Sequence, residues 1–322
     1  AVRQREKAGL LVSSLRRKAG AFYMKRIGHI TDKNGRRLTL VEAMADYGSV
    51  QIAYNKARKC KRYRRDVLIF TKDKEENLER VRNEILGLSY EPGEYRYFKV
   101  YEPKERQIMA LPFYDRVVQH AINNVLEPIF EKRFIFHSYA CRKNKGMHAA
   151  SDTLKSWLYE WQRFHPDTPL YAIKADIHHY FQSINHDVLK AEIRKVIKDA
   201  GALALIDKII EHNGQMPDGT GIPVGNLTSQ LFANIYLDKL DKYIKHTLGA
   251  EKYERYMDDF IILSPDKEEL RRWLADIERF LREELILELN PKTAILCAKN
   301  GIDFVGYKHR TTHRKVRPDS IK

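Results

Sequence analysis

Apolar residues recur every three or four positions in three segments of the chain, which predicts amphipathic helices there. The first segment is 78–88, with Asp73 as its candidate N-cap and Gly87 near its end. The other two carry the apolar sets Val117, Val118, Ala121, Ile122, Val125, Leu126 and Ile129, and, within 266–284, Leu270, Trp273, Leu274, Ile277, Phe280 and Leu281. A capping-box pattern from Thr39 to Glu42 predicts the start of a shorter helix.

Shorter apolar or alternating runs lie between these helices and predict strands. Residues 95–101 and 106–111 are expected to form a hairpin around a turn, and further β-rich segments occupy 170–175, 253–263 and 302–308. Helices interleaved with a few short strands indicate an α+β fold, with helices packed on one face of a sheet.

Length and composition narrow the class of protein. The 322 residues allow one large domain or two ordinary ones, and 43% hydrophobic with 31% charged residues is typical of a globular protein. No run approaches the ~18 apolar residues of a membrane helix, and the N-terminus lacks a signal-peptide pattern. The widely spaced Cys60, Cys141 and Cys297 predict neither a disulfide framework nor a zinc site, so we expect no membrane contact and a reducing, cytoplasmic setting.

Positive charge is concentrated at the N-terminal end of the chain. Residues 1–65 hold 18 Lys and Arg against 4 Asp and Glu, most densely in 56–65, whereas the net charge of the whole protein is +15. The remainder is therefore close to neutral. A concentrated cationic segment favours a nucleic-acid partner, although a solvated arm or an acidic protein surface remains an alternative.

Three acidic residues stand next to apolar strands. Asp258 and Asp259 interrupt the β-prone run of 253–263, and Asp176 ends the strand of 170–175. Adjacent acids in such a run are costly unless they occupy a turn and meet a cation. Acids from two strand ends can hold Mg²⁺, and two Mg²⁺ ions ~3.5–4 Å apart can support in-line phosphoryl transfer. The Asp-Asp pair alone, however, is more typical of an ordinary turn.

The motifs around these acids, taken in order, resemble reverse transcriptases over roughly residues 95–310. Tyr256-Met257-Asp258-Asp259 resembles that family's Tyr-X-Asp-Asp turn, and 175–181 resembles its first catalytic motif, an acid followed five residues later by an aromatic. The resemblance implies an α+β right-hand polymerase fold whose antiparallel palm sheet is backed by helices. The implied division is 1–45 as a basic N-terminal extension, 46–165 as fingers, 166–310 as palm, with 187–217 packing on the fingers, and 311–322 as the start of a thumb that is largely absent from this chain.

The same resemblance implies roles for individual residues. Asp176, Asp258 and Asp259, with the Ile177 carbonyl, would bind two Mg²⁺ ions, and Lys292 in Asn290-Pro291-Lys292-Thr293 would protonate the leaving pyrophosphate. Phe181 would exclude a ribose 2′-hydroxyl. The other expected nucleotide-binding residues are Lys99, Lys104, Arg106, Val224 and Gly225. Expected template or primer contacts are Arg142, in the fingers motif 138–148, Ser229 and Gln230, and Gly306 and Tyr307 in a primer-holding hairpin.

One segment resembles a particular lineage, the diversity-generating retroelement reverse transcriptases. Most reverse transcriptases carry Gln-Gly where this chain has Val224-Gly225, and Ser-Pro where it has Ser229-Gln230. Valine neither donates nor accepts a hydrogen bond, so a positional bond across the nascent base pair, worth about 1 kcal/mol, is absent. The missing bond predicts error-prone copying, and the resemblance implies that template adenines are the bases miscopied into cDNA. The lineage implies a template RNA, dNTPs, an RNA/cDNA duplex and a small, basic, helical accessory protein acting as an oligomer.

Two alternatives stay open. The chain can belong to another reverse transcriptase lineage, of the group II intron, retron or antiviral-defence type. It can also be a polymerase-shaped RNA-binding scaffold without catalysis, which the intact Asp176, Asp258 and Asp259 disfavour.

Overall fold

The computed structural model describes residues 26–32, 34–101, 106–214 and 216–318. A four-stranded antiparallel sheet carries the acidic segments, in the order β6-β7-β5-β8. Its strands are β5 (Tyr171–Asp176), β6 (Lys252–Tyr256), β7 (Asp259–Ser264) and β8 (Ala294–Cys297). The loop between β6 and β7 is only two residues long, so the Asp-Asp pair lies at one end of the sheet, as the sequence predicted.

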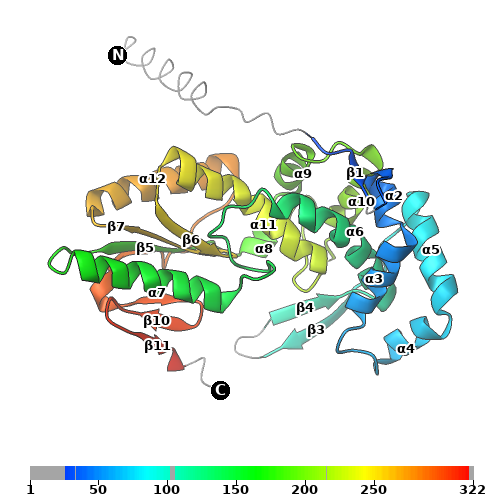
Figure 1. The fold of residues 1–322 in the computed structure, drawn as a ribbon, viewed down its shortest axis with the longest axis horizontal. Coiled ribbons are helices and arrows are strands. Elements are labelled where there is room, and N and C mark those ends of the chain that lie inside the picture. The colour runs from blue at the N-terminus through cyan, green and yellow to red at the C-terminus, as the bar shows by residue number, and fades with distance from the viewer. Residues whose placement is uncertain (1–25, 33, 102–105, 215, 319–322) are drawn as a thin grey trace, which may run out of the picture.

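Helices cover both faces of this sheet (Figure 1). On one face, α11 (Leu227–Lys242) and α12 (Lys267–Glu284) pack in the main core with inward residues such as Ile173, Phe260 and Ile262. On the other face, α7 (Met147–Phe164) packs in a second core with Ala172 and Ile261. The expectation of helices on a single face is therefore wrong: alternate residues on both faces are apolar, so each face needs a covering layer.

A second small sheet lies against α7. It comprises β9 (Ile302–Phe304), β10 (Tyr307–His309) and β11 (Arg314–Val316), all antiparallel. The predicted β9–β10 hairpin is confirmed, with a two-residue loop in which Val305 and Gly306 have φ of 42° and 82°. Residues 314–316, within the 311–322 segment that we expected to begin a thumb, add a strand to this sheet.

The N-terminal half is mainly helical and occupies the opposite side of the molecule (Figure 1). Its elements are β1 (His29–Thr31), β2 (Arg37–Thr39), α2 (Leu40–Met44), α3 (Tyr47–Ala57), α4 (Arg65–Lys72), α5 (Lys74–Leu86), β3 (Arg96–Val100), β4 (Arg106–Ala110) and α6 (Phe113–Glu131). The β3–β4 hairpin, the Thr39–Glu42 capping box and the predicted helices α5, α6 and α12 are confirmed. Asp73 holds the N-cap position of α5, but its side chain makes no capping hydrogen bond there.

Three helices lie in the sequence between β5 and α11. They are α8 (Tyr180–Ser183), α9 (His186–Arg194) and α10 (Ala200–Glu211). Asp199, the N-cap of α10, accepts a hydrogen bond from the Leu40 amide of α2 at 2.7 Å, and Lys208 donates to the carbonyls of Leu88 and Tyr90. These contacts join 187–217 to the N-terminal helices.

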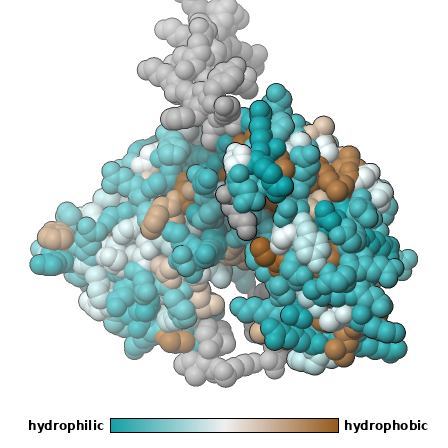
Figure 2. Space-filling view, turned by 45° about the vertical axis from the view of Figure 1, so that its right-hand side comes forward, coloured by the Kyte–Doolittle hydropathy of each residue, from teal (hydrophilic) through white to brown (hydrophobic). Residues whose placement is uncertain are grey.

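The surface shown in Figure 2 is predominantly hydrophilic, with separate small apolar patches. Among the described helices, none combines the length and the apolar character needed to cross a bilayer.

Candidate active site

The β6–β7 hairpin presents Asp258 at the end of the sheet. Its loop consists of Met257 and Asp258, and Met257 adopts a left-handed φ of 59°. Two-residue hairpin loops require positive φ and favour glycine or asparagine there, so a methionine in this position is strained by about 1–3 kcal/mol. Surrounding contacts must therefore hold the turn in place.

Strand register brings the other two acids to the same end. Asp176, the last residue of β5, is directly paired with Asp259, the first residue of β7. Directly opposed residues point to the same face with Cβ atoms ~4.5–5.5 Å apart. Asp176 is further held by Asn290, whose amide donates to the Asp176 carbonyl at 2.7 Å and whose side-chain Nδ2 donates to Oδ2 at 3.2 Å.

The three carboxylates share an electrostatically unfavourable environment. Burial, followed by the negative charge of Asp176, raises the pKa of Asp258 to about 6. Burial also raises the pKa of Asp259 to about 6, even though the Lys174 Nζ donates to its Oδ1 at 2.5 Å and opposes the shift. Raised pKa values of this kind indicate negative charge that the protein itself compensates incompletely.

The three acidic residues meet some, but not all, of the requirements of a divalent-cation site. Asp176 and Asp258 offer hard oxygen ligands whose mutual repulsion a cation would relieve. Within the described ranges, however, no three Asp, Glu, His or Cys side chains are gathered closely enough to hold a metal ion. Asp259 is the acid committed elsewhere, because it is paired with Lys174.

The remaining residues of the expected nucleotide site are divided between the palm segments next to β5 and β8 and the β3–β4 hairpin. Phe181 is half-buried against the main core, and Lys292 is exposed, with its amide donating to Asn290 Oδ1 at 3.0 Å. Lys99 is exposed on β3, Lys104 lies outside the described residues, and only the backbone of Arg106, in β4, is described.

Val224 and Gly225 precede α11. Val224 is half-buried, and Gly225 has a φ of 114°, with space for a Cβ limited by the Met109 carbonyl at 3.3 Å. Glycine is thus required at this close approach between the α11 entry loop and β4.

Two of the expected template contacts are turned into the protein. The Arg142 side chain is 6% exposed, and its guanidinium binds both Glu131 oxygens and the carbonyls of Ile135 and Ser138. Ser229 is 3% exposed. The arginine stabilises the local fold, so direct phosphate contact by either residue does not agree with this structure. Gln230 is exposed, and the Tyr307 hydroxyl lies 3.1 Å from His148 Nδ1.

A cationic groove of about 410 Å³ adjoins the α11 entry loop, and its basic residues were not among the predicted site residues. Its apolar floor includes Phe98, Ile108 and Leu111, and its basic residues are Lys56, Lys59, Lys61, Arg64, Arg116 and His120. Burial and the charges of Arg116 and Arg64 lower the pKa of Lys61, and burial with Lys56 and Lys61 lowers the pKa of His120 to about 4. The dense basic run 56–65 was the sequence signal for this groove.

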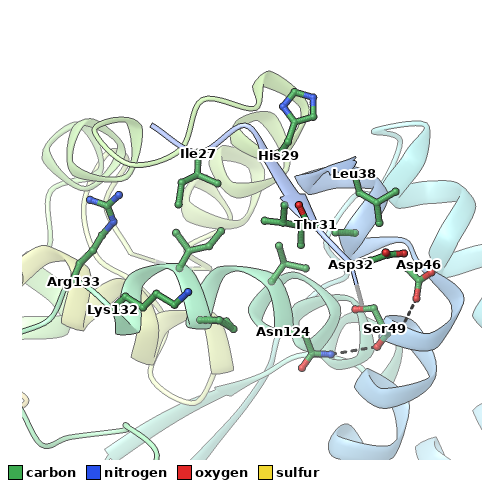
Figure 3. Close-up of a pocket in the computed structure, with 15 residues that line it drawn as sticks. Ile27, His29, Thr31, Asp32, Leu38, Asp46, Ser49, Asn124, Lys132 and Arg133 are labelled. Carbon is green, nitrogen blue, oxygen red and sulfur yellow. Dashed lines mark hydrogen bonds between the residues drawn. The ribbon is translucent and has the colours of Figure 1, made fainter. Parts of the chain in front are cut away.

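The hollow in Figure 3 is larger, about 850 Å³, but none of Asp176, Asp258 and Asp259 lines it. It lies between the β1–β2 hairpin and α6, with an apolar lining that includes Ile27, Leu38 and Ile129. Size alone therefore does not mark the chemical centre of this protein.

Comparison with known proteins supports a common ancestry for the acidic site and its surroundings. Residues 99–309 match the family described as reverse transcriptase (RNA-dependent DNA polymerase). Protein YkfC of Escherichia coli is 28% identical over 283 residues, covering 74% of this chain and 72% of YkfC. The group II intron-encoded protein LtrA of Lactococcus lactis is 27% identical, covering 68% of this chain and 37% of LtrA. The putative COX1/OXI3 intron 2 protein of Saccharomyces cerevisiae is 25% identical, covering 70% of this chain and 32% of that protein.

The chain thus spans about a third of the length of two of these relatives. Among solved structures, the apo telomerase of Candida tropicalis aligns with a TM-score of 0.55 at 14% identity, covering 72% of this chain and 50% of the telomerase. This likeness establishes the right-hand polymerase fold. Since the family match includes Asp176, Asp258 and Asp259 and extends over more than half of the sequence, the chain belongs to the reverse transcriptase (RNA-dependent DNA polymerase) family.

Proposed function

We propose that this chain is the fingers-and-palm part of an enzyme that copies an RNA template into DNA. The observation that carries the proposal is the position of Asp176, Asp258 and Asp259 at one end of the palm sheet, in a chain that also has a cationic groove at the α11 entry loop. A scaffold without catalysis would need no such costly cluster of partly buried acids.

The chemistry is the attack of a primer 3′-hydroxyl on the α-phosphorus of a dNTP, with release of pyrophosphate. Asp176 and Asp258, with the Ile177 carbonyl, would hold Mg²⁺, and Asp259 would join them after leaving Lys174. When bound, the cations supply charge stabilisation at the attacking and leaving oxygens. Lys292 is placed two residues beyond Asn290, which contacts Asp176, so we assign it to proton donation to pyrophosphate.

The cationic groove would bind the backbone of the unpaired template strand. Its cations would neutralise phosphates, while the apolar floor with Phe98 offers a surface for base stacking. Gln230, which is exposed and lines the same groove, would contact the template there, whereas the Ser229 side chain is buried.

The direct test is primer extension on an RNA template with Mg²⁺, comparing wild type with Asp258→Asn. The variant keeps the side-chain volume but removes the charged ligand, so we expect extension to fall by more than 100-fold. Asp303→Asn, on β9, serves as the matched control and should retain activity. Wild-type protein that binds the template-primer yet extends nothing, with or without added partner proteins, would favour the scaffold.

The relatives favour an intron-encoded type of reverse transcriptase over the retroelement lineage. A specific observation still supports mutagenic copying: Val224, beside Gly225, is an apolar side chain at the entry of α11. We therefore keep as a second candidate an error-prone enzyme that copies a template repeat together with a small basic accessory protein.

The two candidates differ in the sequence of the cDNA. Val224→Gln should reduce substitutions opposite template adenines several-fold in the second candidate, because a hydrogen bond of about 1 kcal/mol is restored. Val224→Leu is the matched control, since it changes volume but adds no hydrogen-bonding group. Faithful wild-type cDNA would leave the intron-type enzyme as the function.

A further inference from the structure

Arg255 is a fully buried arginine three residues before Asp258, immediately before the Tyr-X-Asp-Asp turn. Both Arg255 and its ion-pair partner Asp241 have side chains that are 0% exposed. Nε and Nη2 donate to the two Asp241 oxygens at 2.7 Å each, and Nη2 also donates to Ser138 Oγ at 3.1 Å. Nη1 donates to Asn234 Oδ1 at 3.2 Å and to the Met257 carbonyl at 2.8 Å. Five bonds thus match the five N–H groups of the guanidinium.

The bond to Met257 has a different consequence from the others. The Asp241 carboxylate neutralises the buried charge, and Asn234 and Ser138 satisfy two further N–H groups. The remaining bond reaches the backbone of the catalytic turn, at the residue with φ of 59°. A strained conformation persists only where its surroundings determine it, and this hydrogen bond is a direct restraint on the turn that carries Asp258.

The same side chain ties the turn to two other parts of the molecule. Asn234 and Asp241 belong to α11, the helix whose entry loop borders the cationic groove. Asn234 Nδ2 in turn donates to the Ala140 carbonyl at 2.9 Å. The backbone of Arg255 bonds the His137 carbonyl and the Tyr139 amide, both at 2.9 Å. Residues 137–140, α11 and the turn therefore meet at one guanidinium.

We propose that Arg255 is a positioning residue for nucleotide transfer: it holds the Met257 carbonyl so that Asp258 lies where the reaction requires it, and it keeps this turn in register with α11. The proposal rests on the proposed polymerase function. A buried ion pair that only stabilises the core would contact neither the strained residue nor its carbonyl. Misplacement of reacting groups by about 1 Å can cost ~100-fold in rate. The rate of nucleotide transfer is therefore expected to depend on the hydrogen bond that fixes the geometry of this turn.

The test separates positioning from simple stability by comparing Arg255→Lys with Tyr253→Phe. Lysine has three N–H groups on one nitrogen and cannot bind Asp241 at both oxygens while also reaching Met257. Tyr253, on the same strand, donates its hydroxyl to the same Asp241 oxygen but does not bond the turn, so it is the matched control. The thermal midpoint of unfolding is measured for both variants.

Single-turnover incorporation on a template-primer then gives a rate constant and an active fraction. For Arg255→Lys we expect the rate constant to fall about 10- to 100-fold, with the active fraction and the dNTP dissociation constant within about twofold of wild type. Tyr253→Phe should lower the unfolding midpoint but keep the rate constant. Equal rate constants in wild type and Arg255→Lys would overturn the proposal.

Two further measurements test the proposal independently of the Arg255→Lys rate constant. Hydrogen exchange at the amides of 257–259 should accelerate in Arg255→Lys but not in Tyr253→Phe, and unchanged exchange would also overturn it. This result does not depend on polymerase activity, so an inactive wild type would contradict only the proposed function. If Arg255→Lys does not fold, Asn234→Ala releases one of the two bonds of Nη1 and should reduce the rate constant at least threefold. No reduction in that variant would overturn the proposal.

Discussion

At the scale of single residues, Lys174 neutralises one of the three carboxylates of the acidic site, that of Asp259. It stands two residues before Asp176 on the same face of β5, and its ammonium pairs with Asp259 at 2.5 Å. The lysine thereby occupies the position at one carboxylate that a divalent cation would compete for. Metal binding and the Lys174–Asp259 pair are thus expected to oppose each other.

We therefore expect Lys174→Met to bind divalent metal about three- to tenfold more tightly than wild type at pH 8, because the competing cation is removed. Isothermal titration with Mn²⁺, or its paramagnetic resonance signal, measures this without any catalytic assay. Lys252→Met breaks a comparable ion pair, between Lys252 on β6 and Glu160 on α7 at 2.9 Å, and should leave metal affinity unchanged. Equal or weaker binding by Lys174→Met would contradict the competition.

At the scale of elements, the β9–β11 sheet is docked on α7 through one buried histidine. His309 Nε2 lies 2.8 Å from Ser151 Oγ, and Arg314 of β11 donates to Ser151 and Asp152. Burial lowers the pKa of His309 to about 4, so the imidazole is neutral in the folded protein at neutral pH.

This shift makes the docking pH-dependent. An unfolded histidine has a pKa of ~6.5, so between about pH 6.5 and 4 the unfolded chain binds a proton that the folded protein does not. The His309 contribution is complete above pH 6.5 and is lost as the pH falls toward 4, by on the order of 3 kcal/mol for a pKa difference of about 2.5 units. His309→Gln lacks this titration, so its free energy of unfolding should converge toward that of wild type between pH 7 and 5. Chemical denaturation at several pH values measures the difference in free energy of unfolding between wild type and His309→Gln. A difference that stays constant with pH would exclude the contribution of His309 titration.

At the scale of the whole molecule, charge is unevenly distributed between the two halves. The cationic groove lies in the N-terminal helical half beside α3 and α6, while the acidic residues end the palm sheet. A template that follows this gradient would place its unpaired part on the groove and its paired end at the acids. Binding of the nucleic acid should then depend strongly on salt.

Replacing Lys61 and Arg64 together by glutamate should weaken binding of single-stranded RNA about 10-fold or more at 0.1 M salt. The slope of log affinity against log salt should become shallower by ~0.7 for each phosphate that the variant no longer neutralises. Fluorescence anisotropy across a salt series measures both quantities. Arg271→Glu with Arg272→Glu changes the net charge equally but lies on α12, at the other end of the molecule (Figure 1), and should have little effect. An unchanged slope in the groove variant would place the template elsewhere.

The sequence by itself determined three of the amphipathic helices, several strands and the identity of the acidic residues. Helical periodicity located α5, α6 and α12, because an amphipathic helix repeats its apolar face locally. The order of the motifs around Asp176 and Asp258 was sufficient to indicate the reverse transcriptase family and an α+β polymerase fold. The basic run 56–65 indicated a nucleic-acid surface, since charge density along a chain is a local property.

Only the tertiary structure decided what each charged side chain faces. Asp259 and Lys174 are 85 positions apart in the sequence, and their pairing follows from the register of β5 and β7. Arg142 resembles a template-binding arginine in the sequence but is turned inward onto Glu131, whereas Arg255 is buried under the catalytic turn. A local pattern specifies which residues carry charge. Whether such a charge meets water, a phosphate or an acid from a distant segment depends on strand register and helix packing, which only the folded chain establishes.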